Sequence, residues 1–382
     1  MGKYDYDLPF VESDDAVVVM KHMYKRFPIK TDLLGHELVS VKAVNDISLQ
    51  IKKGTTLGVV GESGCGKTTM GRTMLRLYDI TSGEVIYKGF NLTKLSTSEL
   101  RKLIPEDEKY DEARKGNRET LLATLEKTGF DISKVSRSAL RLLRPDMQII
   151  FQDPYSSLSP RMTVGEIIGE AVREHDIVPK SEYREYILRV MKECGLQPHY
   201  FDRYPHEFSG GQRQRICIAR ALALNPKIVI CDEPVSALDV SIQAQIINLL
   251  KDLQEQRGLT YVFISHDLSV VEHISTDVAV MYLGSMMEKA PKEEIFSNPM
   301  HPYTKALLSA VPVPDPDVKM KRIILEGDIP SPANPPAGCK FHTRCKECME
   351  ICKSEEPKLT EYGDGHFVAC HLYSQEKQNE KQ

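Results

Sequence analysis

One stretch of the sequence has residue types suited to holding phosphate. Residues 61–69 fit the spacing G-x-x-x-x-G-K-[ST], and a short apolar run at 57–60 comes directly before them. Glycines let backbone N–H groups approach phosphate oxygens, and a helix starting at the end of the loop adds a partial positive charge. We expect Lys67 to reach the β- and γ-phosphates and the Thr68 hydroxyl to bind Mg²⁺. The residues predicted to contact a nucleotide here are Gly61, Glu62, Ser63, Gly64, Cys65, Gly66, Lys67, Thr68 and Thr69.

A pair of acidic residues follows another apolar run. Asp232 and Glu233 come directly after residues 228–231. A carboxylate at the end of a buried strand can hold Mg²⁺ through water, and the adjacent Glu233 can act as a general base toward water. Alone, this pattern is more typical of a surface turn. Downstream of a phosphate-binding loop it indicates a nucleotide hydrolase or kinase.

A second candidate anion site lies between these two motifs. Ser209, Gly210, Gly211 and Gln212 begin a predicted helix, where a hydroxyl, free N–H groups and the helix dipole face one point. An ordinary helix cap is the alternative. Because one phosphate-binding loop does not need a second phosphate site, this turn is expected to serve a nucleotide held by another subunit.

The elements that position these residues follow an α/β pattern. Apolar runs at 57–60, 228–231 and 261–264 predict buried parallel strands that deliver polar side chains to one edge of a sheet. A helix is expected at about 67–77, and residues 163–200 look helical.

A charged segment at about 101–138 interrupts this pattern. It is predicted to be a solvated insertion with one or two helices, one of them capped by Asn117 and ending at Gly129.

Composition excludes several classes of protein. The 382 residues carry a formal net charge of −4 and are 41% hydrophobic, so the chain is not intrinsically disordered as a whole and its global charge does not predict nucleic-acid binding. No run of about 18 apolar residues is present, and the first residues do not resemble a signal peptide, so a cytosolic location is expected. Of nine cysteines, five lie between residues 339 and 370, which in a reducing compartment favours metal over disulfides.

Over about residues 17–300 the sequence resembles the ATP-binding-cassette (ABC) ATPases. Phe208–Gln212 is similar to the family's signature, with Phe in place of Leu, and Ser236–Asp239 to its D-loop. The resemblance implies an α/β P-loop NTPase fold of ABC type, with a RecA-like core, an antiparallel β subdomain and a helical subdomain at about 150–220. It also implies that Gln152 is the Q-loop glutamine that helps to hold Mg²⁺, that His266 is the catalytic switch histidine, and that Phe27 stacks on adenine.

Within this family, several stretches resemble the ATP-binding subunits of oligopeptide and dipeptide importers, and the F-type subunit in particular. They include residues 56–66, 151–162, 237–245 and 301–308. The resemblance implies ATP and Mg²⁺ as ligands, a D-type ATPase subunit as heterodimer partner, two membrane permeases and an extracytoplasmic peptide-binding protein. The chain would then lie peripherally on the cytoplasmic face of the membrane. Nickel, glutathione or murein peptides remain alternative cargoes, and a soluble cassette acting on ribosomes or DNA is a further alternative.

The C-terminal cysteines resemble a pattern found in the same subunits. Their spacing, C-x5-C-x6-C-x17-C, fits neither paired C-x2-C zinc sites nor a simple ferredoxin run. The resemblance implies a [4Fe–4S] cluster held by Cys339, Cys345, Cys352 and Cys370. Zinc and a set of unligated thiols are the alternatives, and Cys348 is a possible substitute ligand.

Three segments are expected on this basis. An ABC ATPase domain covers residues 1–310, a Pro-rich strap and small Cys-rich C-terminal extension cover 311–373, and a polar tail covers 374–382.

Overall fold

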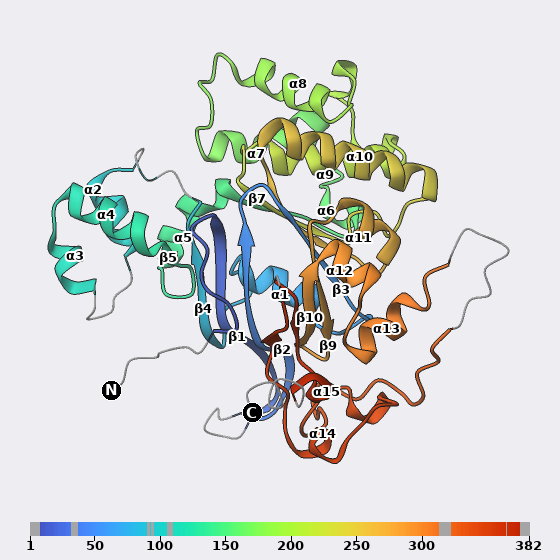
Figure 1. Cartoon of the computed structure of the whole chain (residues 1–382). Coiled ribbons are helices and arrows are strands. Elements are labelled where there is room, and N and C mark those ends of the chain that lie inside the picture. Colours follow the sequence, from blue (N-terminus) through green and yellow to red (C-terminus); the bar gives the residue numbers. More distant parts are fainter. Residues whose placement is uncertain are drawn as a thin grey trace.

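Two β-sheets form the centre of the molecule, with helices packed around them (Figure 1). The structure is a computed structural model that describes residues 8–31, 37–89, 92, 95–104, 110–312, 322–363 and 365–374.

The larger sheet has the strand order β11-β12-β10-β9-β3-β8-β7-β6. Strands β9, β3, β8, β7 and β6 are parallel neighbours, and β10, β12 and β11 continue the sheet in antiparallel fashion. Because parallel strands end at one edge, the loop after β3 and the acids after β7 meet there. The bounds are β3 (Thr56–Val60), β6 (Met147–Ile150), β7 (Ile228–Asp232), β8 (Thr260–Ile264), β9 (Asp277–Tyr282), β10 (Ser285–Pro291), β11 (Thr360–Glu361) and β12 (Phe367–Val368).

The smaller sheet is antiparallel, in the order β2-β1-β4-β5. Its strands are β1 (Ala16–Thr31), β2 (Glu37–Lys52), β4 (Ser82–Tyr87) and β5 (Phe130–Asp131). Side chains from both sheets share one apolar core with the first helix: Val18, Leu49, Val59 and Met70 are all buried in it.

A helical lobe covers one end of the larger sheet, with α8 farthest from the sheet (Figure 1). The strands expected at 228–231 and 261–264 are confirmed as β7 and β8, and the helix expected at 67–77 is α1. In the described part of the chain no helix is both long and apolar enough to cross a bilayer. The helices outside the insertion are α1 (Lys67–Met74), α6 (Pro154–Ser157), α7 (Val164–Glu174), α8 (Tyr183–Glu193), α9 (Gly210–Leu222), α10 (Val240–Arg257), α11 (Leu268–Ile274), α12 (Lys292–Ser297), α13 (Pro302–Leu308), α14 (Glu350–Ser354) and α15 (His371–Ser374).

The charged insertion contains α3 (Asp111–Lys115) and α4 (Arg118–Thr128); α2 (Thr97–Leu103) leads into it and α5 (Arg137–Leu143) leads out of it. The Oδ1 of Asn117 accepts a hydrogen bond from Thr120 N at 2.9 Å, which confirms the expected cap of α4. The helix ends at Gly129, whose φ is 64°.

The expectation that this insertion is solvated is wrong for its inner face. Leu121 and Leu125 are buried in the core that the smaller sheet shares with α1. β5 also pairs with β4, so the insertion extends the smaller sheet. Residues 105–109 lie outside the described part.

The described C-terminal residues pack directly on the larger sheet. β12 pairs with β10, placing Val368 opposite Glu288. Cys339, Phe341 and Cys352 belong to the same apolar core as the helical lobe. The red C-terminal segment therefore extends the edge of the larger sheet and also contacts β2 (Figure 1). Residues 313–321 of the expected strap and 375–382 of the expected tail lie outside the described part.

Candidate functional site

The loop between β3 and α1 leaves the first backbone N–H groups of α1 available to a ligand. Gly66 is the N-cap of this helix and supplies no side-chain cap. Its φ is 104°, and a Cβ there would lie 2.1 Å from the carbonyl oxygen of Ala43, so glycine is required. The first turn of α1 can therefore donate several N–H groups to an anion.

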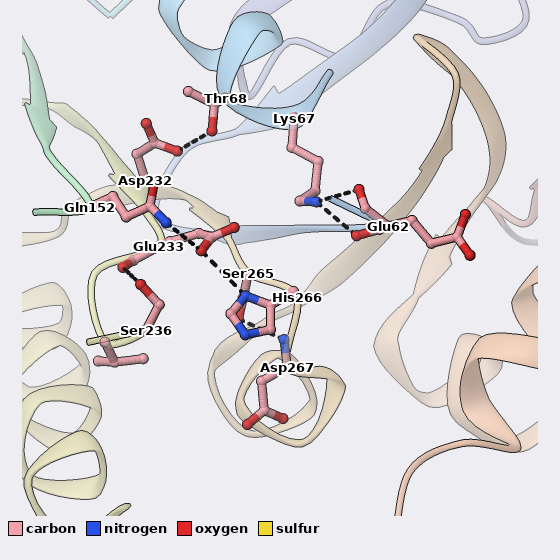
Figure 2. Close-up of polar contacts among 12 residues, drawn as sticks. Glu62, Lys67, Thr68, Gln152, Asp232, Glu233, Ser236, Ser265, His266 and Asp267 are labelled. Carbon is pink, nitrogen blue, oxygen red and sulfur yellow. Dashed lines mark hydrogen bonds and ion pairs between the residues drawn. The ribbon is translucent and has the colours of Figure 1, made fainter. Parts of the chain in front are cut away.

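The predicted phosphate-binding lysine lies inside this loop. Lys67 Nζ donates to the carbonyl oxygens of Gly61 at 2.7 Å and Glu62 at 3.0 Å (Figure 2). Burial raises the pKa of the neighbouring Cys65 thiol, and the charge of Lys67 only partly opposes this. Cys65 is therefore a neutral packing residue, while Lys67 supplies the positive charge.

Asp232 is fully buried at the end of β7 and contacts helix α1. Its Oδ1 accepts a hydrogen bond from Thr68 Oγ1 at 2.6 Å, and Arg72 Nη2 donates to Oδ2 at 3.2 Å. A hydroxyl and a carboxylate side by side form a donor set suited to Mg²⁺. Burial opposes the charge of Arg72, yet hydrogen bonds to Tyr78 and Asp232 raise its pKa overall. The sequence analysis missed Arg72, whose only signal is a basic residue in the last turn of α1.

Three predicted residues from separate strand ends meet at Glu233. Its backbone has a left-handed φ of 48°, and its N–H donates to Ile264 O at 3.0 Å. Glu233 Oε2 accepts from Gln152 Nε2 at 2.9 Å and lies 3.3 Å from His266 Nδ1 (Figure 2). Gln152 follows β6 and His266 follows β8, so the parallel sheet brings the three side chains together.

A cavity of about 610 Å³ is lined by residues of the phosphate-binding loop and by Gln152, Glu233 and His266, but not by Asp232. It has the size of a small-molecule site. Phe27 lies in its wall, with its ring edge-on to Tyr78 at a centroid distance of 5.4 Å. The predicted residues that line the cavity are Phe27, Ser63, Gly64, Gly66, Lys67, Thr68, Thr69, Gln152, Glu233 and His266.

Five further lining residues were missed by the sequence analysis. They are Val41, Lys42, Ala43, Gly284 and Pro332. Pro332 is the least expected of them, because it comes from the far C-terminal region and approaches through its carbonyl oxygen, which accepts from Lys42 N at 3.1 Å. No local pattern signals such a contact.

The predicted second anion site caps helix α9 and does not line this cavity. Ser209 Oγ accepts from Gln212 N at 3.4 Å, and Gln212 Oε1 accepts from Ser209 N at 3.1 Å. Gly211 packs closely on α10, because a Cβ there would lie 2.6 Å from a methyl group of Ile242. Within one chain the signature and the phosphate-binding loop are therefore separate surfaces.

The four C-terminal cysteines predicted as ligands lie near one another. Cys339 N donates to Cys352 O at 2.9 Å. Burial, with the nearby Cys352, Cys370 and Cys345 thiols adding to it, raises the pKa of Cys339 to about 12. Burial likewise raises the pKa of Cys345 to about 11. Thiols in such surroundings stay protonated unless a metal displaces the proton.

The side chains as described do not form a ready metal site. Across the described ranges, no group of three or more His, Cys, Asp or Glu residues has an arrangement that could hold a metal ion. The cluster expected from the sequence is therefore not supported by the arrangement of these thiols, although they are neighbours.

Comparison with known proteins gives two family matches. The pattern that defines the ABC transporter family matches residues 44–121 and 120–236. The pattern described as "Oligopeptide/dipeptide transporter, C-terminal region" matches residues 287–352.

Curated relatives match along almost the whole chain. The oligopeptide transport ATP-binding protein AppF of Bacillus subtilis is 49% identical over 364 residues, which cover 95% of this chain and 99% of the relative. The dipeptide transport ATP-binding protein DppF of Haemophilus influenzae is 46% identical over 346 residues, covering 91% and 93%.

Solved structures agree on the fold. The ATP-binding cassette MJ0796, in a dimeric post-hydrolysis state with ADP and phosphate, matches with a TM-score of 0.55 and 24% identity over 72% of this chain and 98% of that one. The protein cbiO1 from Clostridium perfringens, part of the ABC transporter complex cbiONQ, matches with a TM-score of 0.54 and 22% identity over 74% of this chain and 92% of that one. At these identities the likeness establishes the fold, which is the P-loop fold expected from the sequence.

Proposed function

Because the chain belongs to the ABC transporter family, we propose that it is the ATP-hydrolysing subunit that powers an importer of oligopeptides or dipeptides. The observation that carries the cargo class is the match of residues 287–352 to the C-terminal region of oligopeptide and dipeptide transporters. The names of the relatives, which refer to oligopeptide and dipeptide transport, support the same assignment.

The residues that line the cavity would have separate roles in binding ATP and in hydrolysing it. Phe27 stacks on the adenine, while Lys67 and the backbone N–H groups of residues 61–69 hold the phosphates. Glu233 takes a proton from a water molecule as the water oxygen bonds to the γ-phosphorus. The bond from that phosphorus to the oxygen bridging it to the β-phosphate breaks, giving ADP and phosphate. His266 donates a hydrogen bond to a γ-phosphate oxygen and holds it near Glu233.

Thr68, Gln152 and Asp232 are the side chains that would hold Mg²⁺. The 2.6 Å hydrogen bond between Thr68 and Asp232 places a hydroxyl and a carboxylate within one ligand sphere. Mg²⁺ supplies positive charge against the β- and γ-phosphates when it is bound. Arg72 keeps Asp232 oriented through its other carboxylate oxygen.

The separation of the signature from the cavity supports a second cassette as partner. Ser209, Gly210, Gly211 and Gln212 would complete the nucleotide site of a D-type ATPase subunit, whose own signature would close the cavity described above. The heterodimer would dock through the helical lobe on two membrane permeases at the cytoplasmic face. An extracytoplasmic binding protein would deliver peptide to the permeases.

A [4Fe–4S] cluster on Cys339, Cys345, Cys352 and Cys370 is a separate part of the proposal. Its support is the resemblance of the cysteine pattern in the sequence, because the described side chains do not form a ready metal site. No step of hydrolysis depends on it. The test is an anaerobic preparation, in which a brown protein with about four irons per chain is expected. A colourless protein with one zinc per chain would contradict the cluster.

Reconstitution tests the function as a whole. The two ATPase subunits and two permeases are placed in proteoliposomes with the binding protein, and phosphate release is measured with and without added peptides. Peptide is expected to stimulate hydrolysis and to accumulate on the acceptor side, and Lys67→Ala is expected to abolish both. Hydrolysis stimulated by nickel or glutathione, but not by any peptide, would show that the cargo is different.

A further inference from the structure

The C-terminal region contacts the phosphate-binding loop through one ion pair. Arg344 Nη1 donates to Glu62 Oε1 at 3.1 Å and to Oε2 at 2.8 Å. The Arg344 side chain is 8% exposed and that of Glu62 is 22% exposed. The pair is therefore largely shielded from water, and charge-assisted hydrogen bonds there are stronger than at the open surface.

The backbone of Glu62 is held from the same side. Glu62 N donates to the hydroxyl of Tyr303 at 3.0 Å, and Tyr303 is fully buried on α13. Its ring packs against Tyr282 and Phe341, with centroids 4.8 Å and 5.2 Å away. Arg344 also donates to the Tyr282 hydroxyl at 3.4 Å. The hydroxyl that binds the Glu62 N–H is thus held in place by a buried aromatic cluster.

These contacts act on the part of the loop that holds Lys67. The carbonyl oxygen of Glu62 accepts a hydrogen bond from Lys67 Nζ, and its side chain and N–H are bound by Arg344 and Tyr303. Glu62 does not line the nucleotide cavity, whereas Ser63 does. Its anchoring therefore fixes the peptide plane directly before the residues that face the phosphates.

A second contact joins the same region to the other side of the cavity. Pro332 lines the cavity, and its carbonyl oxygen accepts from Lys42 N at 3.1 Å. The stretch from residue 332 to 344 thus touches both the wall near Phe27 and the loop after β3. Pro332 and Arg344 both lie outside residues 44–236, which match the general ABC pattern.

We infer that Arg344 is a positioning residue for ATP: through Glu62 it holds the phosphate-binding loop in the shape that receives the β- and γ-phosphates. Arg344 itself does not contact the nucleotide. The inference rests on ATP binding by this chain and is independent of the cargo. It predicts that the C-terminal region sets the affinity of the site for ATP, while the rate of the chemical step depends on Glu233 and its neighbours.

The test measures ATP affinity and turnover separately in the reconstituted complex. Arg344→Ala is expected to raise the KM for ATP, and the Kd for Mg–ATP, by about tenfold, with kcat within about twofold of wild type. AMP, which lacks the β- and γ-phosphates, should bind both proteins equally. Arg344→Lys keeps the positive charge on a shorter side chain and should recover part of the lost affinity.

A variant in the phosphate-binding loop distinguishes loss of the ion pair from misfolding of the C-terminal region. Glu62→Gln removes the ion pair with almost no change in size and should raise the KM to a similar extent. Adding Arg344→Ala to it should then have little further effect, because both changes break one interaction. Lys353→Ala is the matched control, because Lys353 is an exposed cation of the same region that forms a surface ion pair with Glu350.

Three results would overturn the inference. One is a KM for ATP that is the same in Arg344→Ala as in the wild type, when the wild type binds ATP. Another is a loss of kcat without a change in KM, which would assign Arg344 to the chemical step. The third is a full tenfold effect of Arg344→Ala in the Glu62→Gln background. Failure of wild type to bind ATP would instead contradict the proposed function.

Discussion

Replacing Glu233 by glutamine removes the proposed general base with almost no change in shape. A glutamine oxygen can still accept the hydrogen bond that Gln152 donates to Glu233 at 2.9 Å. The amide cannot take a proton from water, and general-base assistance usually contributes about 10²–10⁴-fold to a rate. We expect kcat to fall by about 10³-fold, which corresponds to ~4 kcal/mol in activation free energy.

Binding of ATP should survive the same change. The substitution removes one negative charge from a cavity that receives a triphosphate. In a cavity open to solvent, the repulsion between two unit charges about 4 Å apart in water is ~1 kcal/mol. The Kd for Mg–ATP should therefore stay within about fivefold of wild type, on the tighter side. The free energy of unfolding should change by less than ~1 kcal/mol, because the backbone of Glu233 remains held by Ile264.

The assay is phosphate release at saturating ATP from a heterodimer whose partner carries the matching substitution. A wild-type partner would mask the loss by hydrolysing at its own site. Glu272→Gln is the matched control, because Glu272 is an exposed glutamate on α11 that does not line the cavity. This control should hydrolyse ATP at the wild-type rate.

Two outcomes would refute the reasoning. A doubly substituted complex that retains a rate within about tenfold of wild type would show that Glu233 is not the base. A complex that no longer binds Mg–ATP would show that Glu233 organises the site rather than the attack of water.

Two further predictions concern residues at the starts of α13 and α1, the helices that contact or form the phosphate-binding loop. Burial lowers the pKa of His301 to about 4, and its Nδ1 accepts the N–H of Tyr303 at 3.0 Å. Glu288 opposes this shift and Lys305 adds to it. As the pH falls, His301 takes up a proton in the unfolded state before it does so in the folded state. The stabilisation that comes from the neutral, buried imidazole is therefore complete above about pH 6.5 and is lost as the pH drops toward 4. The free energy of unfolding should fall by ~2 kcal/mol at about pH 5. His301→Asn should remove that pH-dependent loss from denaturant unfolding curves, and an identical pH slope in both proteins would contradict the shift. Gly66→Ala should weaken Mg–ATP binding by about tenfold or more, because its Cβ meets Ala43 O at 2.1 Å. Gly54→Ala, with a similar φ but open space around it, is the control, and equal effects of the two changes would rule out the clash.

Much of the candidate site was predictable from the sequence because each motif directly follows a strand. The apolar runs before Gly61, Asp232 and His266 predict parallel neighbours, and parallel strands bring the residues after them to one edge. Gln152 follows β6 in the same way. The order of the motifs, together with the rule that parallel strands end at one edge of a sheet, therefore predicts most of the residues that line the cavity.

The remainder depends on contacts that no local pattern encodes. Arg344 and Glu62 are 282 positions apart, and nothing in the sequence around Arg344 shows that its side chain is shielded rather than on the surface. The inner face of the charged insertion was mispredicted for a related reason. Charge dominates its composition, but Leu121 and Leu125 lie one turn apart on α4 and reach the core.

The position of the C-terminal region implies that the ATP site of this chain is not a property of the cassette alone. Gly284, at the turn between β9 and β10, donates to Cys65 O at 2.8 Å, so the phosphate-binding loop is already tied to the strand that pairs with β12. Arg344 adds an anchor at Glu62 on the same side. Any change that loosens β12 or the cysteine-rich segment will therefore act on the loop that receives the phosphates before it acts on Glu233. Loss of the C-terminal region should accordingly appear first as weaker ATP binding, and only then as slower hydrolysis.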